Sequence, residues 1–153
     1  MKRLICLAIL GLSVGCGGYG PTTPSAPTAA VFVITETPNP IVASAGSNGF
    51  QFAAVFSLAI VESAGMGGNV NFINVTLRDT TTGGEGTHNF SANAIIASAG
   101  TNHIAARGTL NIPNLGVFYT LPLGGRQATM TIVVQLGDDA GHTTNQTATV
   151  QIV

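Results

Sequence analysis

The stretch from residue 128 to residue 153 decides the fold, and it reads ATMTIVVQLGDDAGHTTNQTATVQIV. In its first half every second side chain is apolar: Ala128, Met130, Ile132, Val134 and Leu136. A period of two predicts a strand with one buried face. After a polar turn the alternation resumes, with Gln146, Ala148, Val150 and Ile152 on one face. The stretch therefore predicts a hairpin, and since a hairpin alone cannot bury such a face, the rest of the chain must supply the other half of a core.

The composition is poor in charge. Charged residues make up 7% of the 153 residues, against a usual share of about 25%. Beyond Lys2 and Arg3 the chain has three arginines, no lysine and six carboxylates, a net charge of −3. Nucleic acid is not expected as a partner, because binding to phosphates requires clustered lysine and arginine.

The N-terminal residues have the pattern of a signal peptide. Lys2 and Arg3 form a basic start, and an apolar run of eleven residues follows from residue 4 to residue 14. That run is shorter than the roughly 20 residues that a membrane-spanning helix needs. We therefore expect residues 1–15 to be a helical signal peptide that is removed from the mature protein.

The residues that follow the apolar run, Leu12-Ser13-Val14-Gly15-Cys16, resemble the signal of bacterial lipoproteins. This resemblance implies a lipid on Cys16 and attachment to a membrane. By the same resemblance, Gly17 implies delivery to the outer membrane. The alternative is cleavage by ordinary signal peptidase, which the spacing of Ser13 and Gly15 also suits, giving a secreted or periplasmic product.

Residues 16–30 are expected to form a flexible tether that begins at the lipidated Cys16. The segment is rich in proline, glycine and threonine and has no charged residue. Such a composition cannot bury enough apolar surface to offset its conformational entropy. The folded domain is then predicted to span residues 31–153.

Within residues 31–153 the alternation predicts seven to eight strands separated by glycine-rich turns, with no helix. Residues 90–97 are interpreted as a weak strand, Pro113 as the end of a strand, and residues 114–125 as a connection. This spacing of strands and turns predicts an all-β fold, an antiparallel sandwich of two sheets. The turn Gly137-Asp138-Asp139-Ala140-Gly141 and the strand after it resemble the final hairpin of bacterial immunoglobulin-like and fibronectin III-like surface modules. The resemblance implies an immunoglobulin-like sandwich.

No catalytic motif is present, so the protein is not expected to be an enzyme or to need a cofactor. His88, His103 and His142 are unrelated by spacing, and there is no Cys-x-x-Cys or Gly-x-Ser-x-Gly pattern. The adjacent carboxylates Asp138 and Asp139 point apart in a strand or turn, whereas a general acid and base must converge on one substrate.

Two functions remain as hypotheses. The first is an interaction or structural module of the bacterial cell envelope that binds a protein or a glycan. Its candidate contact surface is Val117, Phe118 and Tyr119, unless these three residues cap the core instead.

The second hypothesis is an envelope protein that binds a small ligand or a divalent metal. Asp138, Asp139 and His142 are its candidate ligands, because carboxylate oxygens in sandwich loops bind Ca²⁺. The alternative interpretation is that aspartate and glycine occur there for their turn geometry.

Overall fold

The predicted C-terminal hairpin lies in the larger of two antiparallel sheets. The structure is a computed structural model that describes residues 25–121 and 126–153. Strands β8 (Ala128–Asp138) and β9 (Thr143–Ile152) pair from Ala128 opposite Ile152 to Gly137 opposite Thr143. Every second side chain of β8 is fully buried, so the predicted inward face is confirmed.

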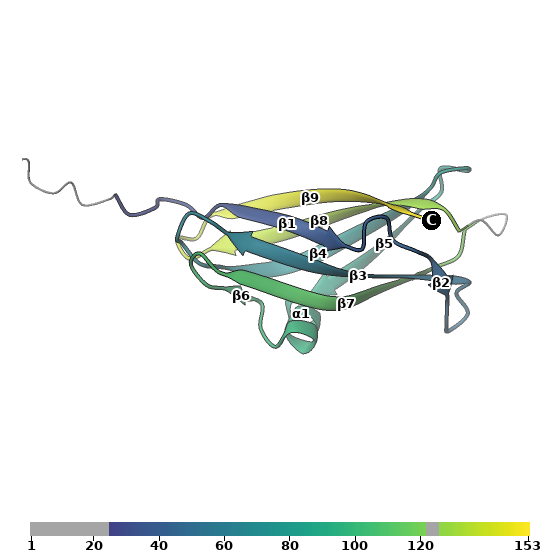
Figure 1. Cartoon of the computed structure of the whole chain (residues 1–153), viewed down its shortest axis with the longest axis horizontal. Coiled ribbons are helices and arrows are strands. Elements are labelled where there is room, and N and C mark those ends of the chain that lie inside the picture. The colour runs from purple at the N-terminus through teal and green to yellow at the C-terminus, as the bar shows by residue number, and fades with distance from the viewer. Residues whose placement is uncertain (1–24, 122–125) are drawn as a thin grey trace, which may run out of the picture.

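Two sheets pack face to face as a sandwich (Figure 1). In the first sheet, β3 (Phe52–Glu62) is central, with β7 (Thr109–Tyr119) on one side and β1 (Phe32–Thr37) and the two-residue β2 (Ser44–Ala45) on the other. In the second, the order is β5 (Glu85–Ser91), β4 (Gly68–Asp79), β8 and β9, and the short β6 (His103–Ile104) also pairs with β4. The all-β, two-sheet architecture predicted from the sequence is confirmed.

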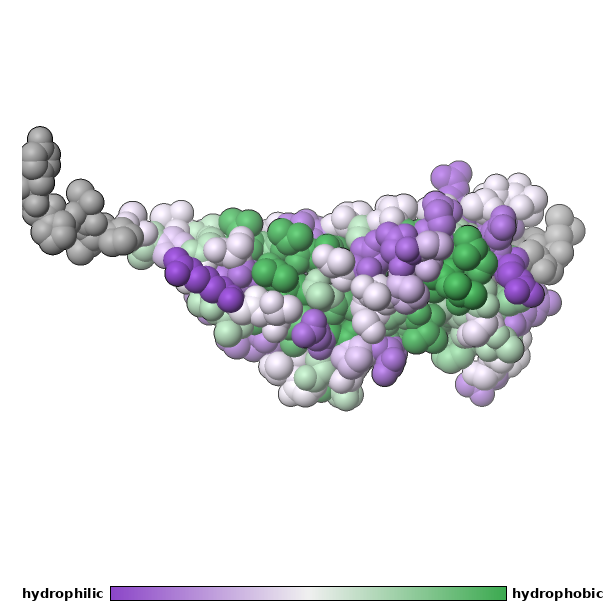
Figure 2. Space-filling view, viewed as in Figure 1, coloured by the Kyte–Doolittle hydropathy of each residue, from purple (hydrophilic) through white to green (hydrophobic). Residues whose placement is uncertain are grey.

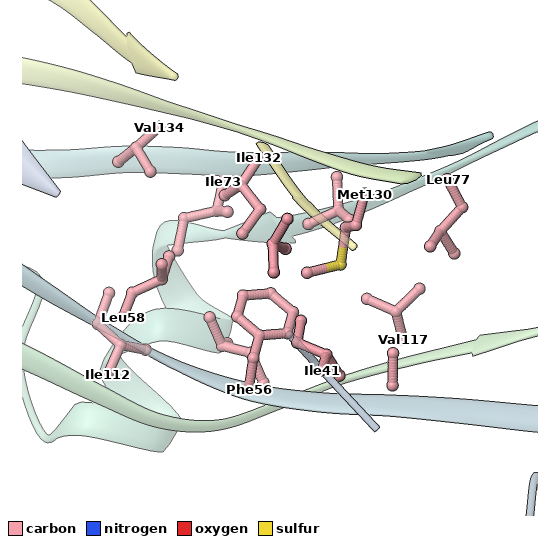
Figure 3. Packing of buried hydrophobic residues seen from close by; sticks show 14 of the residues in the cluster. Ile41, Phe56, Leu58, Ile73, Leu77, Ile112, Val117, Met130, Ile132 and Val134 are labelled. Atoms are coloured by element: carbon pink, nitrogen blue, oxygen red, sulfur yellow. The ribbon is translucent and has the colours of Figure 1, made fainter. Parts of the chain in front are cut away.

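The core lies between the two inner faces. Phe56 of β3 is 1% exposed, and Figure 3 shows its ring directed toward Met130 and Ile132 of the opposite sheet. Leu58 and Ile60 follow Phe56 at period two and are also buried. The apolar alternation of β3 therefore supplies the half of the core that the C-terminal hairpin requires.

On one side of the sandwich the chain itself joins the two sheets. After β1 it leaves the first sheet, and the N–H of Ile41 donates to the carbonyl of Gln151 at 2.9 Å. The N–H of Val153 then donates to the carbonyl of Ile41 at 2.9 Å, and Ile41 forms a parallel bridge with Ile152. The chain returns to the first sheet as β2, so this side is closed by backbone hydrogen bonds.

The opposite side is partly closed by a short helix that we did not predict. The expected strand over residues 90–97 is wrong: β5 ends at Ser91, and helix α1 (Ala92–Ala99) follows. The Ser91 side chain accepts a hydrogen bond from the N–H of Ala94 and caps the helix start, and Gly100, at φ 80°, ends the helix in a left-handed conformation. Ile95 is buried, and the Ser98 hydroxyl donates to the carbonyl of Pro113 at 2.6 Å.

A second prediction is corrected at Pro113, which does not end a strand. The register between β3 and β7 shifts by one residue between Phe56 and Leu58, so Pro113 and Asn114 lie in a bulge, with Asn114 at φ 55°. A bulge accommodates proline because the ladder is interrupted there. The predicted connection from residue 114 is therefore strand as far as Tyr119.

No helix in the described ranges, residues 25–121 and 126–153, is long and apolar enough to cross a membrane. The predicted signal peptide and Cys16 lie outside these ranges. Of the predicted tether, residues 25–30 are described, and they belong to no helix or strand.

Candidate functional site

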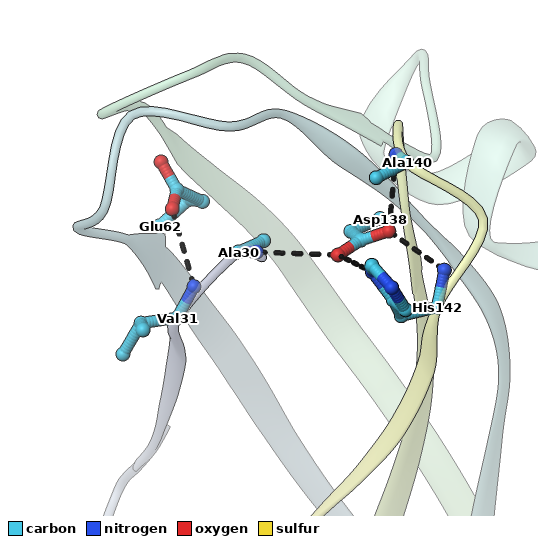
Figure 4. A network of polar contacts seen from close by, with 6 residues as sticks. All are labelled: Ala30, Val31, Glu62, Asp138, Ala140 and His142. Carbon is cyan, nitrogen blue, oxygen red and sulfur yellow. Dashed lines mark hydrogen bonds and ion pairs between the residues drawn. The ribbon is translucent and has the colours of Figure 1, made fainter. Parts of the chain in front are cut away.

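Asp138 forms hydrogen bonds within the turn between β8 and β9. Its side chain is 4% exposed. Oδ1 accepts from the backbone N–H groups of Ala140 at 3.0 Å and His142 at 2.8 Å. Oδ2 lies 3.0 Å from Nδ1 of His142 and accepts from the N–H of Ala30 at 3.2 Å (Figure 4). Burial alone would raise the pKa of Asp138, but the bonds from His142 and Ala30 outweigh it and lower the pKa to about 2.

The other two candidate metal ligands do not converge with Asp138 on one point. Asp139 is exposed, and its N–H donates to the carbonyl of Gly67 at 3.0 Å. The His142 side chain is exposed and approaches Asp138 through one ring nitrogen. Within the described ranges no three His, Cys, Asp or Glu side chains are placed to hold a metal ion. The geometry is that of a turn whose aspartate caps its own backbone.

Glu62 is a second buried carboxylate at this end of the sandwich, and it is not among the site residues predicted from the sequence. It is 1% exposed and accepts hydrogen bonds from the N–H groups of Arg107 at 2.7 Å, Ala64 at 2.8 Å and Gly65 at 2.9 Å. It also accepts from the N–H of Val31 at 3.3 Å. Burial would raise the pKa of Glu62, but these donors lower it to about 2.

Glu62 and Asp138 together form what we call the entry clamp. They belong to different sheets, yet they bind the consecutive residues Val31 and Ala30 (Figure 4). The clamp fixes the direction in which the chain enters the domain. The sequence did hold a signal for Glu62, because it stands in phase with the buried residues Leu58 and Ile60 at the end of β3.

A groove lies at the opposite end of the sandwich. It has a volume of about 460 Å³ and runs between residues 84–88, at the start of β5, and residues 117–121, at the end of β7. Leu77 of β4 and the exposed Phe50 also line it. We call it the edge groove, because β5 and β7 are the edge strands of the two sheets on this side.

The edge groove exists because β5 lacks side chains where the core would continue. Gly86 is paired with Leu77, so it faces inward as Leu77 does. A Cβ atom built on Gly86 would have no atom within 4 Å. Helix α1 closes the same side only farther along, where it contacts β7 near Pro113. The two sheet edges are therefore left apart beside residues 84–88.

Asp79 orders the turn that leads into this part of β5. It is buried, and its carboxylate accepts from the Thr82 hydroxyl at 2.5 Å and from the N–H of Thr81 at 2.8 Å. The hydrogen bond from Thr82, with the bond from Thr81, lowers the pKa of Asp79. One wall of the groove is thus held by an internally bonded turn.

The candidate contact residues all line the edge groove, but they differ in exposure. Val117 and Tyr119 are buried, and the Tyr119 hydroxyl donates to the carbonyl of Arg126 at 2.9 Å. Burial raises the pKa of Tyr119, although Arg126 acts in the opposite direction. Phe118 is 41% exposed, and its ring centroid lies 6.3 Å from that of Phe50, which is 47% exposed. Figure 2 shows apolar surface near this end and further apolar patches along the rest of the same face.

Comparison with known proteins supports the fold alone. No family model and no curated protein matches the sequence. The chain is similar in structure to Northeast Structural Genomics Consortium target SoR45, with a TM-score of 0.58 and 9% identity over 81% of this chain and 86% of that one. It is equally similar to the putative ApaA protein from Bordetella pertussis, with a TM-score of 0.58 and 10% identity over 80% and 92% of the two chains. These likenesses assign no function.

Proposed function

We propose that this protein is a non-catalytic binding module of the bacterial cell envelope, anchored by a lipid on Cys16. The N-terminal pattern of basic start, apolar run and Cys16 supports the anchor. The proposed location is the outer membrane, with a secreted or periplasmic product as the alternative. The proposed partner is a protein or glycan.

The observation that carries the proposal is the placement of the chain entry relative to the edge groove. The chain enters the domain at Ala30 and Val31, where the entry clamp binds it, and the groove lies at the other end of β3. A strand of eleven residues is about 35 Å long, so the two ends are well separated. A domain anchored through Cys16 thus presents the groove away from the membrane.

The tether suits this arrangement. Residues 17–29 contain no charge, and in an extended polyproline-like state they reach about 40 Å at roughly 3.1 Å per residue. A diacylglycerol on Cys16 with an acylated amino group exceeds the two hydrophobic anchors that stable attachment needs. The tether is therefore long enough for the domain to stand clear of the headgroups, and because its composition predicts a flexible chain the entry end can also approach them.

The anchor is tested by replacing each cysteine in turn. Full-length wild type, Cys16→Ser and Cys6→Ser are expressed in a bacterium that processes lipoproteins, and partition between detergent and aqueous phases is measured. We expect wild type and Cys6→Ser in the detergent phase and Cys16→Ser in the aqueous phase, because Cys6 lies inside the apolar run. Wild type in the aqueous phase together with Cys16→Ser would refute lipidation in favour of plain secretion.

A further inference from the structure

We propose that the edge groove binds an extended peptide segment of a partner protein, which adds a strand to β5 and places one large apolar side chain in the groove. A basic residue of the peptide lies near Glu85. This inference rests on the proposed binding function and names the class of partner, but it does not depend on the lipid anchor.

The first support is the free backbone edge of β5. The N–H of Asp79 donates to the carbonyl of Gly84, directly opposite, which fixes the phase of the ladder with β4. Because the bonded positions alternate, the backbone N–H and C=O groups of Glu85, Thr87 and Asn89 turn away from β4. These groups have no partner among the described residues. An unpaired edge of this kind is a template for strand addition.

The second support is the space beside that edge. A strand added to β5 directs every second side chain toward the inner face of its sheet. At Gly86 this face has no side chain of its own. The buried side chain of Leu77 lies beside it in β4, and the buried Val117 lines the groove from β7. The volume of about 460 Å³ falls within the range of ligand sites, roughly 300 to 1,000 Å³. A leucine or phenylalanine of the peptide can therefore be buried there.

The third support is charge. Glu85 is the only residue with a formal charge among the described residues that line the groove, and its side chain lies on the outer face of β5, opposite Arg78. Its contact with Arg78, at 3.8 Å, is weak because both side chains are more than half exposed. The rings of Phe50 and Phe118 stand at the rim and attract cations as well as apolar groups. A basic residue next to the apolar one therefore complements the groove, whereas an acidic residue is repelled.

Two single variants distinguish the contribution of the free β5 backbone to peptide binding from that of the edge groove. Gly86→Val fills the space without a clash, since nothing lies within 4 Å of the new Cβ. Thr87→Pro removes one outward N–H, and its ring would block a strand at that edge, while the ladder with β4 keeps its bonds. Both variants are made in the full chain with Cys16→Ser, so that lipidation has no influence. Their unfolding midpoints are compared with that of the parent protein.

The probe is a displayed library of random ten-residue peptides, selected on the parent protein. We expect selected peptides that combine a large apolar residue with a nearby lysine or arginine, and we expect both variants to weaken their binding about tenfold or more. N-methylation of alternate peptide amides should have the same effect, and it replaces Thr87→Pro if that variant fails to fold. Amide signals of Glu85, Thr87 and Asn89 should shift on binding.

Three results would overturn the proposal. Peptides that bind both variants as well as the parent protein would lie elsewhere on the surface. Binding lost in Gly86→Val but unaffected by Thr87→Pro and by N-methylation would indicate a site for a small apolar molecule. A dimer of the parent protein that Thr87→Pro dissociates would assign the edge to a second copy of this chain.

Discussion

The backbone N–H of Ala30 donates a hydrogen bond of 3.2 Å to Oδ2 of Asp138, 108 residues further along the chain. The next residue, Val31, donates to Glu62 in the other sheet at 3.3 Å. Backbone donors held by two buried carboxylates, one from each sheet, make the chain entry part of the folded domain. The tether is therefore expected to end at Ala30, and its attachment point lies at the end of the sandwich away from the edge groove.

Asp138→Asn should release Ala30 without breaking the turn. An asparagine oxygen can still accept from Ala140 and His142, but its amide nitrogen cannot accept from Ala30. We expect hydrogen exchange at the Ala30 amide to accelerate by roughly tenfold. Asp139→Asn is the control, because Asp139 is exposed and its carboxylate makes no hydrogen bond within the described residues. Equal exchange at Ala30 in both variants would show that Asp138 does not hold the entry.

The entry clamp should make folding stability sensitive to acid. Folding lowers the pKa of Glu62 from 4.5 to about 2, and that of Asp138 from 3.8 to about 2. A pKa that is lower in the folded state adds stability above the unfolded pKa, and this stability is lost as the pH falls toward the folded pKa. The urea midpoint should therefore be steady above about pH 5 and fall between pH 4.5 and pH 2.

Glu62→Gln tests this assignment at one residue. The variant should be less stable than wild type at pH 7, because Glu62 accepts bonds from several backbone N–H groups. The difference should shrink as the pH falls to 2, since wild-type Glu62 is then being protonated. A difference in urea midpoint that stays constant from pH 7 to pH 2 would mean that the pKa of Glu62 is not lowered.

The parts of the fold that could be predicted are the strands in which apolar and polar residues alternate over many positions. β8 alternates from Ala128 to Leu136 and β9 in its second half, and the burial of Ile132 and Val150 follows that pattern. Helix α1 was missed because its eight residues are mostly alanine and isoleucine, which alternate plausibly as a strand. The Ser91 cap and the left-handed conformation of Gly100 stabilise the helix at its two ends. The sequence alone does not show whether such local hydrogen bonds outweigh pairing of the segment as a strand.

The candidate site was only partly predictable for the same reason. Phe118 stood out as a large apolar residue, but its position in a strand depended on the bulge at Pro113, which tertiary pairing with β3 stabilises. Gly86 lies in the glycine-rich stretch Gly83-Gly84-Glu85-Gly86, whose composition is typical of a loop, yet it occupies an inward position of β5. A groove formed by a missing side chain leaves no positive signal in the sequence.

Replacing adjacent residues of β8 by aspartate should lower the unfolding free energy by very different amounts. Ile132 is fully buried between the sheets, whereas Thr131 lies on the outer face between Thr76 and Thr149. Ile132→Asp places an unpaired carboxylate in the core and should cost at least about 3 kcal/mol of unfolding free energy. Thr131→Asp should cost about 1 kcal/mol or less. Urea denaturation of both variants checks this, and similar midpoints would contradict the assignment of the two faces.

Calcium should not bind at the turn between β8 and β9. Both oxygens of Asp138 already accept hydrogen bonds, and Asp139 and His142 do not converge with it. Calorimetric titration should give a flat trace up to about 1 mM Ca²⁺, which is the dissociation constant of the weakest extracellular calcium sites. Saturable heat that disappears in Asp138→Asn or in Asp139→Asn would restore the metal-binding hypothesis.

The proposal that the edge groove faces away from the membrane is tested most directly by measuring how far each end of the domain lies from the membrane. A single fluorescent label is placed at Ala140→Cys, near the entry clamp, or at Thr120→Cys, at the edge groove, in lipidated protein with Cys6→Ser on vesicles that carry a headgroup quencher. We predict stronger quenching at residue 140 than at residue 120, because the two ends are about 35 Å apart. Equal quenching at both positions, or stronger quenching at residue 120, would contradict a groove that faces away from the membrane.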